Sequence, residues 1–273
     1  MAELATKYLG LTLRNPLIIG SSNLTDSVEN IKELEQNGAG AVVLKSIFEE
    51  QIALESESEL QDAQSDNLIY SEKSESLDYI DLHIKEDTLH HYINLIKDAK
   101  KEVLIPVIAS INCITSAEWI TFAKELEKAG ADALELNIAI PPSELFKSTQ
   151  KIENTYFEII KKVSEIVTIP IAIKISPFFT NLGKMIEKIA ATDVSGIVLF
   201  NRYYSPDFDI NNFSEITANT YSNSKDYTNS LRWIAITSDR INKDLVASTG
   251  IHTGETVIKQ LLAGAKAVEI VST

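Results

Sequence analysis

The sequence has very few residues that could bind a metal or form a disulfide. It holds one cysteine, Cys113, and four histidines among 273 residues. A single cysteine excludes an intrachain disulfide and a multi-cysteine metal or iron–sulfur site, and the scattered histidines lack the spacing of a zinc site. We therefore expect any electron- or group-transfer chemistry to use an organic cofactor and no metal.

Positive charge and long apolar runs are also scarce. Lys and Arg number 25 against 39 Asp and Glu, which gives a formal net charge of −14. This acidity disfavours nonspecific binding to nucleic acid or to anionic membranes. No apolar run is long enough to span a bilayer, and no charged-then-apolar secretory start is present. We expect a cytoplasmic protein whose main partner is a small-molecule substrate.

The chain does contain a repeated alternation of strands and helices. Eight β-branched or apolar runs predict strands at 16–20, 41–45, 106–111, 132–138, 170–175, 196–200, 244–248 and 267–271. Helical spacing occurs at 27–38, 116–130, 153–167, 181–192 and 254–264. One short helix-to-strand turn recurs in "LEQNGAGAVVLK", "LEKAGADALELN" and "LLAGAKAVEIV". The pattern predicts a single α/β domain over 1–273, a (β/α)8 TIM barrel.

Two connections and the end of the chain depart from the regular repeat. Residues 46–87 are acidic and serine-rich, and residues 202–229 are rich in aromatics and asparagines. We expect both to be long loops on the ligand-binding rim, able to close over substrate or to contact a second subunit of a homodimer. The sequence stops directly after the eighth predicted strand, so we expect the barrel to lack its final helix.

Polar residues and glycines end most of the predicted strands. In this fold the carboxyl ends of the strands face one rim, where the functional groups lie. These strand-end residues are Gly20, Ser21, Lys45, Ser46, Asn112, Asn137, Lys174, Asn201, Gly250 and Ser272. A ring with two lysines and three asparagines suits a large, partly anionic, heteroatom-rich ligand better than a metal. Exposed strand ends collect polar residues in any case, so at each single position a structural role explains the residue equally well.

Lys174 lies within a predicted strand. Alternation in "PIAIKI" directs Ala172 and Lys174 into the barrel and the isoleucines toward the helices. The same parity directs Glu135 inward and predicts a Glu135–Lys174 pair. That pair could be only an interior salt bridge. Alternatively, a buried Lys174 could be the Schiff-base nucleophile of an aldolase-like barrel.

Several segments together resemble the dihydroorotate dehydrogenase family of flavin mononucleotide (FMN) barrels, especially its divergent dihydroorotate dehydrogenase-like branch. They include "YLGLTLRNPLIIGSSNLT" (8–25), "GAGAVVLKSIFEEQI" (38–52), "GADALELNI" (130–138), "IPIAIKISPFFT" (169–180) and "STGIHTGETVIKQLLAGA" (248–265). The resemblance covers essentially the whole chain. It implies an FMN-dependent oxidoreductase acting on CH–CH bonds. Its reaction would be dihydroorotate to orotate, in pyrimidine biosynthesis, or that of a related small molecule. The electron acceptor or partner flavoprotein is not identified.

The resemblance also assigns roles to residues. It assigns FMN binding to Gly20, Ser21, Lys45, Ser46, Asn112, Asn137, Lys174, Gly250 and Ser272. It assigns substrate binding to Lys45, Asn137 and Asn201. A fixed cation at Lys174 stabilises the negative charge that reduction places on the N1–C2=O edge of the flavin. Asparagines suit a flavin edge because they both donate and accept hydrogen bonds. The phosphate is expected near Gly250 and Ser272.

This sequence departs from the family pattern at two places. "ELNIAIPP" puts Ile140 where the family has a serine or cysteine base, and Pro142 where a substrate-binding asparagine is usual. Because isoleucine cannot accept a proton, Ser143, Cys113, Tyr203 or Tyr204 are alternative bases. Thr249 and Val271 stand where the family usually has glycines of the phosphate site. A flavin-binding protein that has lost dihydroorotate chemistry is therefore a further hypothesis.

Overall fold

The computed structural model describes residues 4–48, 75–112, 116–140, 146–202, 206–217 and 221–272. Eight parallel strands form a closed ring. They are β3 (Leu17–Ile19), β4 (Ala41–Val43), β6 (Val107–Asn112), β7 (Ala133–Asn137), β8 (Ile171–Ile175), β9 (Gly196–Leu199), β12 (Asp244–Ser248) and β13 (Ala267–Ile270). Each pairs with the next, and pairing of β13 with β3 closes the ring. All eight predicted strands are present, and the predicted (β/α)8 barrel is confirmed.

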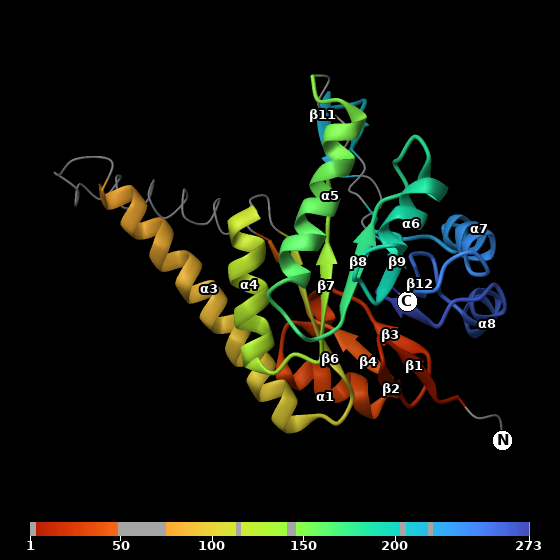
Figure 1. Cartoon of the computed structure of the whole chain (residues 1–273), viewed down its shortest axis with the longest axis horizontal. Helices are drawn as coiled ribbons and strands as arrows, with labels where there is room; N and C mark the ends of the chain where they lie inside the picture. Colours follow the sequence, from red (N-terminus) through yellow and green to blue (C-terminus); the bar gives the residue numbers. More distant parts are fainter. Residues whose placement is uncertain are drawn as a thin grey trace.

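The helices of the described residues lie outside the ring (Figure 1). They are α1 (Val28–Gln36), α3 (Glu75–Glu102), α4 (Ser116–Ala129), α5 (Thr149–Ser164), α6 (Leu182–Ala190), α7 (Tyr227–Thr237) and α8 (Gly254–Leu262). None of the described helices is both long enough and apolar enough to cross a membrane. Within the described residues, which reach 272, no helix follows β13.

Local sequence signals set the ends of several helices. Side chains of Ser27, Ser148, Asn181 and Thr253 accept hydrogen bonds from backbone N–H groups of the first turns of α1, α5, α6 and α8. The repeated helix-to-strand turn has a glycine with positive φ after α1, α4 and α8: 103° at Gly38, 99° at Gly130 and 109° at Gly264. Glycine adopts this left-handed conformation without steric cost. The chain can therefore leave each helix and enter the next strand within a few residues.

The barrel strands bury both of their faces. Outward residues such as Ile171, Ile173 and Ile175 of β8 pack with the helices in the outer core. Inward residues at the amino-terminal end of the barrel form a second apolar cluster, which includes Ala172. The cluster is completed by Tyr8 and by other residues of a hairpin, β1 (Thr6–Tyr8) with β2 (Leu11–Leu13). This hairpin closes the barrel at the end opposite to the strand carboxyl ends, and it was not predicted from the sequence.

The predicted loop over 46–87 is partly wrong. Residues 47–48 form the short strand β5 (Ile47–Phe48), and α3 begins at Glu75, whereas 49–74 lie outside the described residues. Within α3, Tyr92, Leu95, Ile96 and Ala99 are buried. Their spacing of i, i+3, i+4 and i+7 is the ordinary signal of an amphipathic helix, so the sequence alone could have revealed it.

The predicted loop over 202–229 is also more ordered than expected. It contains an antiparallel hairpin, β10 (Pro206–Asp209) with β11 (Ser214–Thr217), and α7 begins at Tyr227. Several large apolar side chains of this region are exposed, among them Phe208, Ile210 and Phe213. β10 is exposed on both faces along most of its length, so its four residues carry no pattern of buried apolar positions that would predict a strand.

Candidate active site

The inner face of the barrel becomes polar toward the carboxyl ends of the strands. Six buried polar residues lie there on five strands: Ser110 (β6), Glu135 and Asn137 (β7), Lys174 (β8), Ser248 (β12) and Glu269 (β13). Strand register places Ser110 beside Glu135, and Ser248 beside Glu269. Buried polar groups of this kind are costly unless they are paired, so their partners decide what the layer can do.

Lys174 is held between two carboxyl groups. Its Nζ lies 2.6 Å from Oε2 of Glu269 and 3.3 Å from Oε1 of Glu135. The three side chains are 8%, 0% and 1% exposed, respectively. The predicted Glu135–Lys174 pair is confirmed, but the closer partner, Glu269, was missed. The signal was present, because Glu269 follows Ala267 by two residues in β13 and so shares its inward face.

Burial changes the protonation of this cluster. Burial raises the pKa of Glu135 well above its ordinary value, and the charge of Glu269 raises it further against the opposing effect of Lys174. For Lys174, burial acts to lower the pKa, but the charges and hydrogen bonds of Glu135 and Glu269 outweigh burial and raise it. Lys174 is therefore an ammonium at neutral pH.

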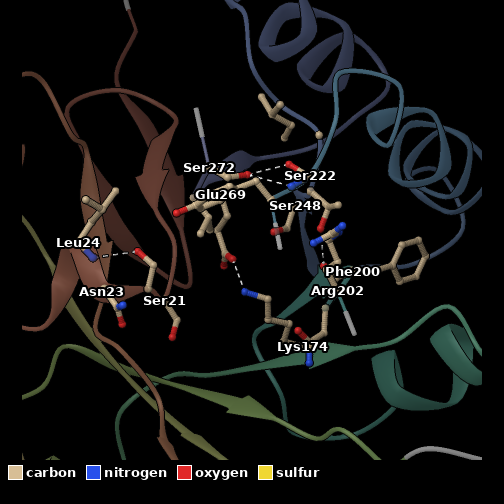
Figure 2. A pocket seen from close by; sticks show the side chains of 17 residues that line it. Ser21, Asn23, Leu24, Lys174, Phe200, Arg202, Ser222, Ser248, Glu269 and Ser272 are labelled. Carbon is tan, nitrogen blue, oxygen red and sulfur yellow. Dashed lines mark hydrogen bonds and ion pairs between the residues drawn. The ribbon is translucent and has the colours of Figure 1, made fainter. Parts of the chain in front are cut away.

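A pocket of about 750 Å³ opens above Lys174 and Glu269. Its walls come from the segments that follow β3, β9, β12 and β13, together with residues 221 and 222. Among the residues predicted from the sequence, Ser21, Lys174, Asn201, Gly250 and Ser272 line it. Figure 2 shows the amino group of Lys174 reaching Glu269. The rim end of the barrel therefore combines a cavity of ligand size with a fixed cation at its floor.

A chain of hydroxyl groups connects one wall of this pocket to the barrel interior. Oγ of Ser46 lies 3.0 Å from Oγ of Ser21 and 2.7 Å from Oγ of Ser110. The backbone N–H of Ser46 also donates to Oγ of Ser21 at 2.8 Å. At the far end, the backbone N–H of Ser110 donates to the Tyr92 hydroxyl at 3.0 Å. Ser46 thus adjoins the pocket through Ser21, although it does not line it.

Two predicted asparagines contact each other. Nδ2 of Asn201 donates to Oδ1 of Asn137 at 2.8 Å, which joins the end of β7 to the segment after β9. Strand register also places Asn137 beside Lys174. Lys45 and Asn112 are half-buried at the ends of β4 and β6 and are not among the residues that line the pocket. The structure therefore brings the amides of Asn137 and Asn201 together with Lys174, but not Lys45 or Asn112.

A second polar group lies on the wall formed by the β12 and β13 ends. Oγ of Ser222 lies 2.8 Å from Oγ of Ser272 and 3.1 Å from Nε2 of His252. Figure 2 shows Ser222 and Ser272 side by side in the pocket. Sequence reasoning identified Ser272 but missed Ser222 and His252. Ser222 belongs to an irregular segment with no strand or helix pattern, so nothing in the sequence places it beside β13.

Comparison of the sequence with protein-family models identifies the family of this chain. The model described as dihydroorotate dehydrogenase matches residues 3–273. The chain belongs to the dihydroorotate dehydrogenase family. This confirms the family recognised in the sequence, and it supports the predicted class of enzyme, a dehydrogenase acting on CH–CH bonds, while leaving the substrate open.

Curated members of the dihydroorotate dehydrogenase family are similar to the chain at low identity. A protein of Thermoplasma volcanium is 26% identical over 99% of this chain and 86% of its own length. One from Methanocaldococcus jannaschii is 24% identical over 98% of this chain and 86% of its length. A Geobacillus protein is 30% identical over 61% of this chain and 55% of its length. All three are named dihydroorotate dehydrogenase B (NAD(+)), catalytic subunit.

The two places where the sequence departs from the family pattern, the loop after β7 and the expected phosphate site, lie in different surroundings. Ile140, which the resemblance aligns with the family's base, is half-buried and packs against the outer core, and its side chain is no proton acceptor. Pro142, Ser143, Cys113, Tyr203 and Tyr204 lie outside the described residues. Val271 lines the pocket, and a Cβ added to Gly20 would lie 2.7 Å from its Cγ2. Gly20 therefore permits close packing of the segments that follow β3 and β13, and the Val271 side chain occupies part of the pocket wall.

Gly250 also has a steric reason to be glycine. Its φ is +76°, and a Cβ there would overlap the backbone nitrogen of Tyr227 and lie 2.8 Å from the carbonyl carbon of Asp226. The glycine therefore lets the end of β12 approach the first turn of α7. In this member of the dihydroorotate dehydrogenase family, the segment after β12 thus lies against the start of α7 at one wall of the pocket.

Proposed function

We propose that this chain binds FMN in the rim pocket and uses it to oxidise dihydroorotate, or a related cyclic small molecule, at a CH–CH bond. The observation that carries the proposal is the buried ammonium of Lys174 at the floor of a cavity of about 750 Å³. Cavities of a few hundred to about 1,000 Å³ are typical of cofactor sites. FMN, when bound, accepts the hydride, which is chemistry that no side chain supplies.

The residues around the pocket fit this cofactor. Lys174 offers a cation, and the Asn137–Asn201 pair offers amide donors and acceptors near it. Ser222, His252 and Ser272 gather hydroxyl and imidazole groups on the β12–β13 wall. Groups of this kind, with backbone N–H groups near the start of α8, suit a phosphate. We assign the ring to the Lys174 end and the phosphate to the Ser222–Ser272 end.

The remaining predicted residues act at the edges of this arrangement. Ser21 lines the pocket wall next to β3, and Gly20 packs behind it against Val271. Ser46 orients Ser21 through a hydrogen bond. Lys45 and Asn112 do not line the pocket, and we keep them as proposed contacts to FMN. Lys45 and Asn201 are the proposed contacts to substrate. Because Ile140 cannot take the substrate proton, we propose that a residue outside the described ranges, such as Ser143, accepts it.

A Schiff-base role for Lys174 is not favoured. That chemistry needs a neutral amine, whereas Glu135 and Glu269 hold Lys174 in its charged form. The electron acceptor we propose is NAD+, reached through a partner subunit, by extension from the names of the relatives. NADH formation from dihydroorotate by the chain with a partner subunit, but not without one, is the expected result.

The proposal is tested by the visible spectrum of the purified chain. We expect the chain to retain or take up FMN, and anaerobic dihydroorotate to bleach the flavin band at an enzymatic rate. Retention of FMN without bleaching would remove dihydroorotate as the substrate and leave a flavin protein with different chemistry. A colourless protein that does not take up added FMN would refute the proposal.

A further inference from the structure

The Lys174 cluster holds more carboxyl groups than its charge requires. Two carboxylates and one ammonium, if all were ionised, would leave a net charge of −1 in a region where the side chains are at most 8% exposed. Burying an uncompensated charge is strongly unfavourable, so the cluster is expected to take up one proton and become neutral. Oε1 of Glu269 is buried and has no hydrogen-bond partner among the described residues. The Glu135 carboxyl interacts with that of Glu269.

The other ionisable groups that face the cluster do not supply the missing positive charge. Tyr8 faces Glu135 and Glu269 from the hairpin below, and Asp244 adds negative charge at the start of β12. Tyr92 faces Glu135 from α3. Burial raises the pKa of both tyrosines, and the nearby carboxylates reinforce this shift, so the two phenols stay neutral. Neutrality of the cluster therefore depends on a proton held by the carboxyl groups.

We propose that Glu135 and Glu269 share one proton beside Lys174, and that this pair takes up a second proton from solvent when negative charge arises in the pocket above it. The second half rests on the proposed function, because a bound flavin is the group that would acquire the charge. The first half does not depend on any ligand. In chemical terms, one carboxylate oxygen gains a proton from water, and the cluster changes from neutral to a net charge of +1.

The geometry explains why the pair, and not Lys174 alone, would respond. With Glu269 at 2.6 Å, the charge of Lys174 is already compensated, so the resting cluster offers little net attraction to an anionic group above it. A further proton on the two carboxyl groups gives the cluster a net charge of +1, which attracts an anionic group in the pocket. Glu269 lines the pocket and the Glu135 carboxyl contacts it, so the change would occur directly beneath the ligand. Both glutamates are thus positioning residues that act through Lys174.

The shared proton is tested in the ligand-free protein by infrared spectroscopy at pH 7. We expect the carbonyl band of a protonated carboxyl in the wild type, and its loss in both Glu135→Gln and Glu269→Gln. Either substitution leaves one carboxylate for one ammonium, so no extra proton is needed. Glu102→Gln, which removes an exposed partner of Lys32, should retain the band. A band that is absent from the wild type, or that survives in Glu269→Gln, would overturn the proposal.

The second proton is tested on the FMN-loaded protein by measuring the midpoint potential between pH 7 and 8.5. For a two-electron couple each coupled proton contributes about 30 mV per pH unit. We expect about 59 mV per pH unit for the wild type and about 30 mV for the double variant Glu135→Gln/Glu269→Gln. Equal slopes in the two proteins would refute this half. Failure to bind FMN would refute the proposed function and this half with it, whereas the infrared band decides the shared proton independently.

Discussion

Replacement of Lys174 by methionine gives the sharpest test of the buried cluster. Methionine has a similar length but no charge, so Glu135 and Glu269 would remain buried without their cation. Both carboxyl groups lie within 3.3 Å of Nζ, and their side chains are at most 1% exposed. Removing one partner of a buried ion pair costs about 3–5 kcal/mol. At about 2–4 °C per kcal/mol for large domains, the thermal midpoint should fall by about 6–20 °C.

The loss should also depend on pH in a fixed direction. A carboxyl whose pKa is higher in the folded state contributes its full stability below its unfolded pKa of about 4.3, and this contribution is lost as pH rises. Glu135 already shows this direction in the wild type. In Lys174→Met both buried carboxyl groups must hold a proton, whereas one does in the wild type. The loss of stability relative to the wild type should therefore grow between pH 5.5 and 8, by up to about 1.4 kcal/mol per pH unit.

The assay is thermal unfolding followed by circular dichroism at pH 5.5 and pH 8, with Lys32→Met as the control. Lys32 forms an equally short pair with Glu102 at 2.6 Å, but the two side chains are 43% and 48% exposed. Such surface pairs contribute at most about 1 kcal/mol. The reasoning would be refuted if Lys174→Met lost no more stability than Lys32→Met at pH 8, or if its loss were the same at both pH values.

Three further predictions concern residues in or next to the pocket walls. Gly250→Ala should destabilise the chain by about 1–3 kcal/mol and weaken FMN retention, since its φ is +76° and the new Cβ would overlap the first turn of α7; a thermal midpoint equal to that of the wild type would contradict this. Ser46→Ala should cost about 1–3 kcal/mol because two hydroxyl partners lose a hydrogen bond. Ser164→Ala is its control, since the buried Ser164 hydroxyl has no partner among the described residues and its loss should be nearly neutral. Asn201→Ala should raise the KM for substrate more than it lowers FMN content, as steady-state kinetics and flavin absorbance would show; equal loss of both would assign Asn201 to the cofactor.

The sequence predicts the barrel well because the barrel strands carry a regular pattern. The β8 run places Lys174 inward and its isoleucines outward, and the structure has this arrangement. The repeated turn glycines mark where helices end. By contrast, the β10–β11 hairpin is exposed and short, and α7 is held by packing against β9 and β12, so neither carries a strong local signal. Helix α3 does carry one, the buried stripe from Tyr92 to Ala99.

The candidate site could be predicted only in part for a similar reason. Strand-end position identifies which residues reach the rim, and it places Ser21, Lys174 and Asn201 correctly at the pocket. It does not give distances across the barrel. Glu269 and Lys174 are 95 residues apart in sequence, so their pairing follows from closure of the ring and not from local pattern. Strand-end position likewise cannot show that Lys45 and Asn112 lie apart from the pocket.

The position of Glu269 on β13 has a consequence for the order in which the protein is made. Chains are synthesised from the amino terminus, so Lys174 leaves the ribosome 95 residues before Glu269. Until β13 inserts between β12 and β3, those two strands expose unpaired edges, which are prone to aggregation. The same insertion seals the sheet and brings Glu269 to the lysine. The pocket is therefore completed in the same step that covers these strand edges.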